Sequence, residues 1–102
     1  MTKIAVVYYS ATGNIAAMAN AIGEGAASVG AEVRVRRVAE TAPADAIASN
    51  PKWQAHFDEM ANEPLATLDD LEWADGIALG SPTRFGGPAS QLKSFLDTTG
   101  GL

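Results

Sequence analysis

The sequence predicts an α/β fold in which short parallel strands alternate with helices. Three short segments, at 3–9, 32–38 and 76–80, are rich in β-branched, aromatic or other apolar residues. Helical spacing of apolar residues follows the first and the third of these, at 15–29 and 89–97. This alternation indicates a parallel sheet with right-handed crossovers. A chain of 102 residues is typical of one domain.

The first strand and helix have the clearest patterns. Segment 3–9 is almost continuously apolar, which is typical of a strand buried on both faces. Small and polar residues at 10–14 predict a loop. A helix is expected at 15–29, and Gly30 stands where the C-terminal cap of this helix belongs. Glycines at 23 and 25 weaken that helix by about 1 kcal/mol each and allow its close approach to a sheet. The residues expected to face inward are Ile15, Met18, Ala19, Ile22, Ala26 and Val29.

The rest of the chain is less regular until its last strand. Segment 32–38 alternates polar and apolar residues, which predicts an edge strand with one solvated face. Three prolines punctuate the region 39–70. The remaining expected elements are helical turns at 44–48, 52–61 and from 69, a strand at 76–80, a loop at 81–88 and a helix at 89–97.

Composition excludes several classes of protein. The formal charge of −5 argues against a nucleic-acid partner, which requires basic residues to neutralise phosphates. The absence of cysteine excludes disulfide scaffolds, thiolate nucleophiles and cysteine-bound zinc, and a single histidine excludes a multi-histidine metal site. No apolar run is long enough to span a membrane and no signal peptide is evident, so a cytoplasmic protein is expected. We interpret His56 as a surface residue away from the loops, and Trp53, Phe57 and Trp73 as core or subunit contacts.

The loop at 10–14 is a candidate anion site. It follows a strand and opens a helix, whose first N–H groups are unpaired and carry partial positive charge. Hydroxyls of Ser10 and Thr12 and the amide of Asn14 add donors, and Gly13 permits a tight turn. The loop has no lysine and one glycine, so it matches neither the nucleoside-triphosphate loop nor the dinucleotide fingerprint. The alternative is an ordinary turn with a serine or threonine cap.

The loop at 81–88 is expected to meet the first loop. In a sheet of order 2-1-3, the first and third strands flank the point where strand order switches, and ligands bind beyond that point. Gly86 and Gly87 let the backbone approach a flat ring, and Thr83 can bond to ring carbonyls. Arg84 can place positive charge beside a ring that becomes negative on reduction, and Phe85 can pack on its edge. The alternative is a simple connection with a solvent-facing arginine.

Three segments together resemble one known family. Residues 9–15 (YSATGNI), 80–86 (GSPTRFG) and 95–102 (FLDTTGGL) are similar to the WrbA family. These proteins are FMN-dependent NAD(P)H:quinone oxidoreductases (type IV) with a flavodoxin-like, doubly wound parallel sheet. The string at 82–86 is the specific part, because ordinary flavodoxins do not carry it. The resemblance covers all 102 residues.

The resemblance implies a cofactor site and a reaction. Hydride would pass from NAD(P)H to FMN, and two electrons would pass on to a quinone. The flavin carries this chemistry, so no catalytic side chain and no metal are expected. Some members have a tyrosine at position 12 that is associated with the nicotinamide; here it is Thr12, which receives no such role. Tetramers are also implied. The implied phosphate residues are Ser10, Ala11, Thr12, Gly13, Asn14 and Ile15, and the implied ring residues are Pro82, Thr83, Arg84, Phe85 and Gly86.

The chain departs from the family in length. It corresponds to the first half, so residues 1–102 are expected to be the N-terminal part of a single flavodoxin-like domain, without strands four and five. The third strand would then be an exposed edge that invites pairing. We expect the chain to be a fragment of a longer protein. The alternatives are a short gene product that completes its sheet by pairing with a second copy, and a remnant that folds with a partner. Alternative functions are a flavodoxin-type electron carrier and a flavin-free interaction module.

Overall fold

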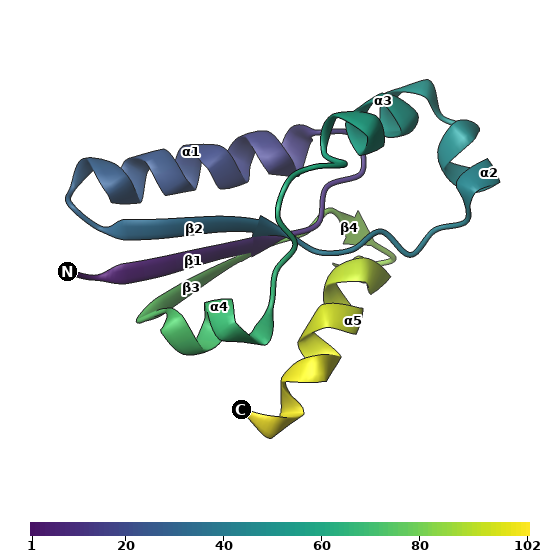
Figure 1. Ribbon diagram of the computed structural model, residues 1–102. Coiled ribbons are helices and arrows are strands. Elements are labelled where there is room, and N and C mark those ends of the chain that lie inside the picture. The colour runs from purple at the N-terminus through teal and green to yellow at the C-terminus, as the bar shows by residue number, and fades with distance from the viewer.

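A three-stranded parallel sheet organises the protein (Figure 1). The computed structural model describes residues 1–102. Strand β1 (Lys3–Tyr8) lies in the centre, between β2 (Glu32–Arg37) and β3 (Gly76–Gly80). Both pairings are parallel, and Ile4 lies opposite Val33 on one side and Gly76 on the other. The predicted parallel α/β fold with strand order 2-1-3 is confirmed.

Helices cover both faces of this sheet. Figure 1 shows α1 along one face, α4 and α5 on the other, and α2 and α3 beyond the carboxyl end of the strands. A short 3₁₀ helix follows α5, and none of the helices combines the length and apolarity needed to cross a bilayer. The helices are α1 (Asn14–Ser28), α2 (Ala44–Ala48), α3 (Pro51–Glu59), α4 (Leu68–Trp73) and α5 (Ser90–Asp97).

Local sequence signals explain where the helices begin and end. The Asn50 side chain accepts hydrogen bonds from two backbone N–H groups of α3, and Pro51 occupies the first helical position. Thr67 and Asp70 form a reciprocal capping box at the start of α4. Gly30, at φ +91°, follows the end of α1 as expected. Such short-range signals place most helix ends within two residues of their predicted positions.

The central strand is buried on both faces, as predicted. On one face, Val6 and Tyr8 pack beneath α1 against Ala16 and Ala19. On the other face, Val7 belongs to a second cluster. That cluster also contains Tyr9, Val38, Ala89 and Leu92, which are all buried. Two small cores therefore share β1 as their common wall.

The predicted inward stripe of α1 was wrong in part. Ala19 is buried as expected, but Met18 and Val29 are 60% and 85% exposed. Small residues face the sheet instead, namely Ala16, Ala19 and Gly23. Because they are small, the helix approaches the strands closely, and the bulky side chains lie along its flank. There Met18 and Ile22 line an open apolar groove beside β3.

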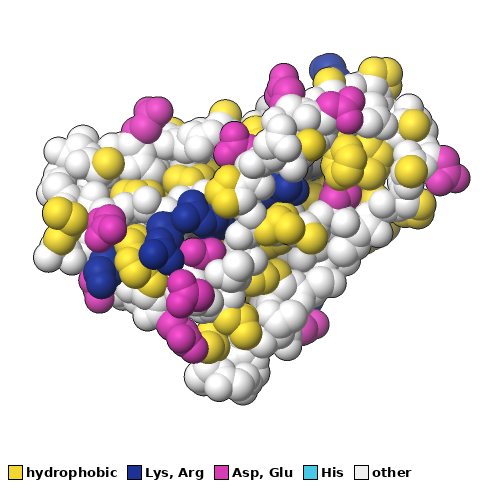
Figure 2. Space-filling view, viewed as in Figure 1, with side chains coloured by type: hydrophobic (Ala, Val, Ile, Leu, Met, Phe, Trp, Pro, Cys, Tyr) yellow, Lys and Arg dark blue, Asp and Glu magenta, His cyan; other side chains and the backbone are white.

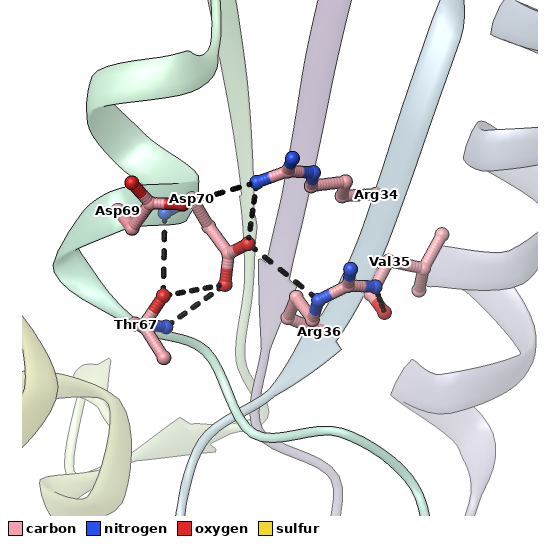
Figure 3. A network of polar contacts seen from close by, with 6 residues as sticks. All are labelled: Arg34, Val35, Arg36, Thr67, Asp69 and Asp70. Carbon is pink, nitrogen blue, oxygen red and sulfur yellow. Dashed lines mark hydrogen bonds and ion pairs between the residues drawn. The ribbon is translucent and has the colours of Figure 1, made fainter.

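The polar face of β2 is covered rather than solvated, which corrects the sequence-based expectation. Buried Asp70 from α4 accepts a hydrogen bond from Arg34 Nη1 at 3.2 Å and pairs with Arg36 Nε at 3.6 Å (Figure 3). Its Oδ2 atom accepts from the Thr67 N–H at 2.9 Å. The Arg34 guanidinium lies 4.1 Å from the centre of the Trp73 ring. Figure 2 shows a row of basic side chains between α1 and α4, with acidic ones beside it.

The loop predicted at 81–88 contains a small hairpin. Strands β4 (Thr83–Arg84) and β5 (Gly87–Pro88) pair antiparallel across a tight turn. Each strand has only two residues, so the sequence has no alternating pattern long enough to reveal it. Figure 1 shows β4 beyond the carboxyl end of the sheet, where the first loop also lies.

Alanine substitutions at the two helical glycines should have opposite effects on stability. A Cβ on Gly25 would meet no atom within 4 Å, whereas a Cβ on Gly23 would lie 2.8 Å from Val35 Cγ2. We expect Gly25→Ala to raise the free energy of unfolding by about 0.5–1 kcal/mol through helix propensity. We expect Gly23→Ala to lower it by about 1 kcal/mol through overpacking. Urea denaturation measures both, and equal stabilisation by the two variants would contradict the close approach at Gly23.

Asp70 should contribute far more to stability than its neighbour Asp69. Asp70→Asn leaves two arginines without their buried carboxylate, and we expect a loss of about 3 kcal/mol in the free energy of unfolding. Asp69 also approaches Arg34, at 3.5 Å, but its side chain is 83% exposed. Asp69→Asn is the matched control, with an expected loss of about 0.5 kcal/mol or less. Similar losses in both variants would mean that burial of the Asp70 pair is not what stabilises this face.

Candidate functional site

The two candidate loops begin side by side at the carboxyl edge of the sheet. Tyr9 follows β1, and its backbone N–H donates to the carbonyl of Gly80 at 3.0 Å. A Cβ on Gly80 would lie 3.1 Å from Ile15 Cγ2, so the start of α1 contacts the end of β3. Parallel pairing of β1 and β3 thus brings the start of residues 81–88 against the loop at 10–15, as the sequence predicted.

The first loop presents a set of free backbone donors. Gly13 is the N-cap of α1 at φ +106°, and its N–H donates to Ser10 Oγ at 3.1 Å. The helix has no side-chain cap, so the predicted alternative of a serine or threonine cap is not what forms. The N–H groups of Ala11, Thr12, Asn14, Ile15 and Ala16 are among those here that donate to no acceptor in the protein. Free N–H groups at a helix N-terminus favour an anion.

The second loop presents an exposed hairpin tip. Ser81 Oγ accepts from the Ala89 N–H at 2.8 Å, which closes the base of the hairpin. Phe85 adopts φ +52°, a conformation uncommon for residues other than glycine, and its side chain is fully exposed. Gly86 follows at φ +81°. A backbone of this kind persists where the surroundings impose it, and it recurs at ligand sites.

The structure brings the bases of the loops together but does not join their tips. Pro82, Thr83, Arg84, Phe85 and Gly86 form no hydrogen bond or ion pair with residues 10–15. The Arg84 guanidinium donates to the carbonyl of Thr83 at 3.0 Å and is otherwise exposed. Thr83, Arg84, Phe85 and Gly86 remain accessible to a ligand that approaches from beyond the sheet edge.

A single carboxylate, that of Glu40, links the segments around the first loop. Its Oε1 atom accepts from the Tyr9 hydroxyl at 2.6 Å and from Trp53 Nε1 at 2.8 Å. Its Oε2 atom accepts from Gln91 Nε2 at 2.6 Å and from the backbone N–H groups of the two residues that follow it. Glu40 therefore connects the end of β1, the end of β2, α3 and α5.

These contacts shift two pKa values in the directions expected. Burial alone would raise the pKa of Glu40, but the hydrogen bonds donated by Tyr9, Gln91 and Trp53 outweigh burial and hold that pKa below its usual range. Burial raises the pKa of Tyr9 far above its usual range, and the hydrogen bond to Glu40 and the charge of Glu40 raise it further. The positive charge of Arg84 opposes this rise in the pKa of Tyr9 in part.

Sequence reasoning missed Glu40 and Gln91 and misplaced His56. His56 was expected on the surface away from both loops, but it is 8% exposed and its Nδ1 atom lies 3.4 Å from where a Cβ on Gly13 would be. The reason is that α3 folds back over the carboxyl edge of the sheet (Figure 1). One signal could have found Glu40: it follows β2 closely, and the ends of parallel strands meet at one edge.

Removing the Glu40 charge should destabilise the protein near neutral pH and much less in acid. Glu40→Gln replaces one acceptor oxygen by a donor, so we expect a loss of about 2 kcal/mol at pH 7. Because the pKa of Glu40 is lower in the folded state, its contribution is present above the ordinary value of 4.5 and is lost as pH falls below it. Urea denaturation at pH 7 and pH 3 measures the difference.

The control for this variant is Glu24→Gln, because Glu24 is exposed on α1 and forms no hydrogen bond or ion pair through its side chain. We expect it to change the free energy of unfolding by less than about 0.5 kcal/mol at either pH. A Glu40→Gln loss that persists unchanged at pH 3 would contradict a role for the Glu40 charge.

Comparisons with known proteins agree with this geometry. Residues 2–101 match the family described as NADPH-dependent FMN reductase. A protein of Deinococcus radiodurans named NAD(P)H dehydrogenase (quinone) is 50% identical over 98% of this chain and 50% of its own length. One of the same name from Azorhizobium caulinodans is 51% identical over 100% of this chain and 49% of its own length. The chain spans about half the length of the curated relatives it matches. Because the family match extends over nearly every residue, the chain belongs to the NADPH-dependent FMN reductase family.

Proposed function

We propose that this chain forms the FMN-binding part of an FMN-dependent NAD(P)H:quinone oxidoreductase. One observation carries the proposal: the free N–H groups at the start of α1 lie beside the base of an exposed, conformationally constrained hairpin. The first feature suits a phosphate group, and the second suits a flat ring. FMN contains both. The names of the relatives, NAD(P)H dehydrogenase (quinone), support the donor and the acceptor.

The first loop fits the phosphate of FMN. The backbone supplies N–H donors without acceptors, and the dipole of the fifteen-residue helix α1 adds partial positive charge. We assign Ser10, Ala11, Thr12, Gly13, Asn14 and Ile15 to this role. Gly13 adopts a left-handed conformation at φ +106°, where any larger residue would be strained. No acidic residue lies in the loop to repel the anion.

The hairpin fits the isoalloxazine ring. We assign Pro82, Thr83, Arg84, Phe85 and Gly86 to it, because they are the accessible residues beyond the carboxyl end of β3. Exposed Phe85 offers apolar surface for a ring edge. Arg84 offers positive charge, which favours a ring that carries negative charge after two-electron reduction. When bound, FMN supplies the hydride and electron chemistry; the protein supplies position and charge.

Finer features of the proposal rest on the resemblance. The string at 82–86 supports the WrbA subtype within the family. With that subtype we propose a homotetramer in the cytoplasm, and residues 1–102 as the N-terminal part of one flavodoxin-like domain. Nucleic acids and membranes are not among the proposed partners.

A titration with FMN tests the proposed site. We expect the chain to quench flavin fluorescence saturably. We also expect the chain with FMN to oxidise NAD(P)H with benzoquinone as acceptor. Where the remaining half is required, the longer protein should do so. Loss of flavin fluorescence follows from contact between the ring and the protein. Fluorescence intensity and NAD(P)H absorbance are the two measurements.

The same experiment separates the alternatives. A stable one-electron flavin radical without NAD(P)H turnover would favour a flavodoxin-type electron carrier. No quenching by the chain or by the longer protein would favour a flavin-free interaction module and overturn the proposed function.

A further inference from the structure

We propose that the imidazole of His56 is an additional hydrogen-bond donor to the phosphate group held at the first loop. This inference rests on the proposed function, since it names a further residue of the same site. His56 lies on α3, far along the chain from residues 10–15, and no pattern in the sequence connects the two.

The imidazole is buried against the N-cap of α1. It is 8% exposed. Its Nδ1 and Cε1 atoms lie 3.4 Å and 3.9 Å from the position of a Cβ on Gly13, so this edge of the ring faces the loop. His56 also lines a cavity with Ser10 and Ala11. The side chain is therefore aimed at the segment whose N–H groups have no acceptor.

His56 has no hydrogen-bond partner among the side chains and carbonyls of the protein. No fully buried side-chain nitrogen or oxygen of the protein lacks a partner, so the ring nitrogens of His56 keep some contact with solvent and are open to a ligand. A bound anion would supply the acceptor that the protein does not. The position thus has the two properties of a ligand-binding side chain: burial beside free backbone donors, and an unused donor of its own.

Several other polar groups around the same cavity are already engaged. The Arg37 guanidinium donates to the carbonyls of Glu63 and Ala61 at 3.0 Å and 3.4 Å. Glu40 accepts hydrogen bonds at both carboxylate oxygens, and one of them is donated by Tyr9. Ser10 Oγ accepts from the Gly13 N–H within the loop itself, and His56 is a side chain from another element that faces Gly13 with its donor unused.

The competing explanation is that His56 only packs against Gly13. A packing role and a phosphate role differ in how they depend on the ligand. Riboflavin has the same ring as FMN but no phosphate. Loss of a phosphate ligand should weaken the binding of FMN alone, whereas general disturbance of the site should weaken the binding of both flavins. A donor role, unlike a packing role, should also be retained in a variant that keeps an N–H group at this position.

The first measurement uses the fact that His56 is the only histidine of the chain. Its imidazole signals in a ¹H–¹⁵N spectrum therefore need no assignment. We expect them to move on titration with FMN and with inorganic phosphate, and to move much less with riboflavin.

The second measurement compares dissociation constants for variants. His56→Phe keeps a ring of similar size without a donor, and we expect FMN to bind about tenfold more weakly, as for loss of a hydrogen bond to a charged group. Riboflavin binding should be unchanged. His56→Gln keeps an N–H donor and should retain most of the FMN affinity. Lys52→Met, at an exposed position of the same helix, is the control and should leave both affinities unchanged.

Each outcome decides something. Unmoved imidazole signals with FMN, or equal weakening of FMN and riboflavin in His56→Phe, would overturn the role of His56 and leave the proposed function standing. The same holds if FMN affinity is unchanged in His56→Phe. If neither flavin binds the wild-type protein, the proposed function falls, and the inference falls with it.

Discussion

Burial of β1 between two parallel neighbours is the constraint on which the rest of this structure depends. Because β2, β1 and β3 run in the same direction, the segments that follow them all leave from one edge. The candidate phosphate loop, the Glu40 segment and the hairpin are those three segments. Residues distant in the chain thus become neighbours through backbone pairing before any side chain contributes. The site is a consequence of strand direction, which in turn follows from the alternation of strands and helices.

Side chains then fix the arrangement of that edge. Glu40 accepts hydrogen bonds from Tyr9, which follows β1, and from side chains of α3 and α5, so the energetic cost of burying its charge is offset. His56 approaches the same region from α3 and lies against Gly13. At this edge the Glu40 carboxylate already has its hydrogen-bond donors, whereas the backbone N–H groups of the first loop have no acceptor. Such an arrangement favours an anionic ligand at the loop and keeps the surrounding segments in register.

The fold could be predicted from the sequence because its signals are local. Apolar runs lie within the elements that they define, and Gly30 lies just after the helix that it ends. The buried face of α1 could not be predicted from the sequence. Its apolar residues span a broad stripe, and only tertiary packing decides which part of that stripe meets the sheet. Both loops of the candidate site could be located along the chain, since each directly follows a strand; their role as a site stays a prediction. Glu40 and His56 were missed because their partners lie in other elements, and a single sequence does not report such contacts.

The central claim is that the loop at 10–15 and the hairpin at 83–88 hold one ligand together. Backbone amide signals in a ¹H–¹⁵N spectrum test it most directly, because each loop reports separately. On titration with FMN, signals of Ala11–Ala16 and of Thr83–Gly87 should move with a single dissociation constant, while those of the Asp70 region stay in place. Movement of one loop without the other, or different dissociation constants for the two, would contradict a shared flavin site.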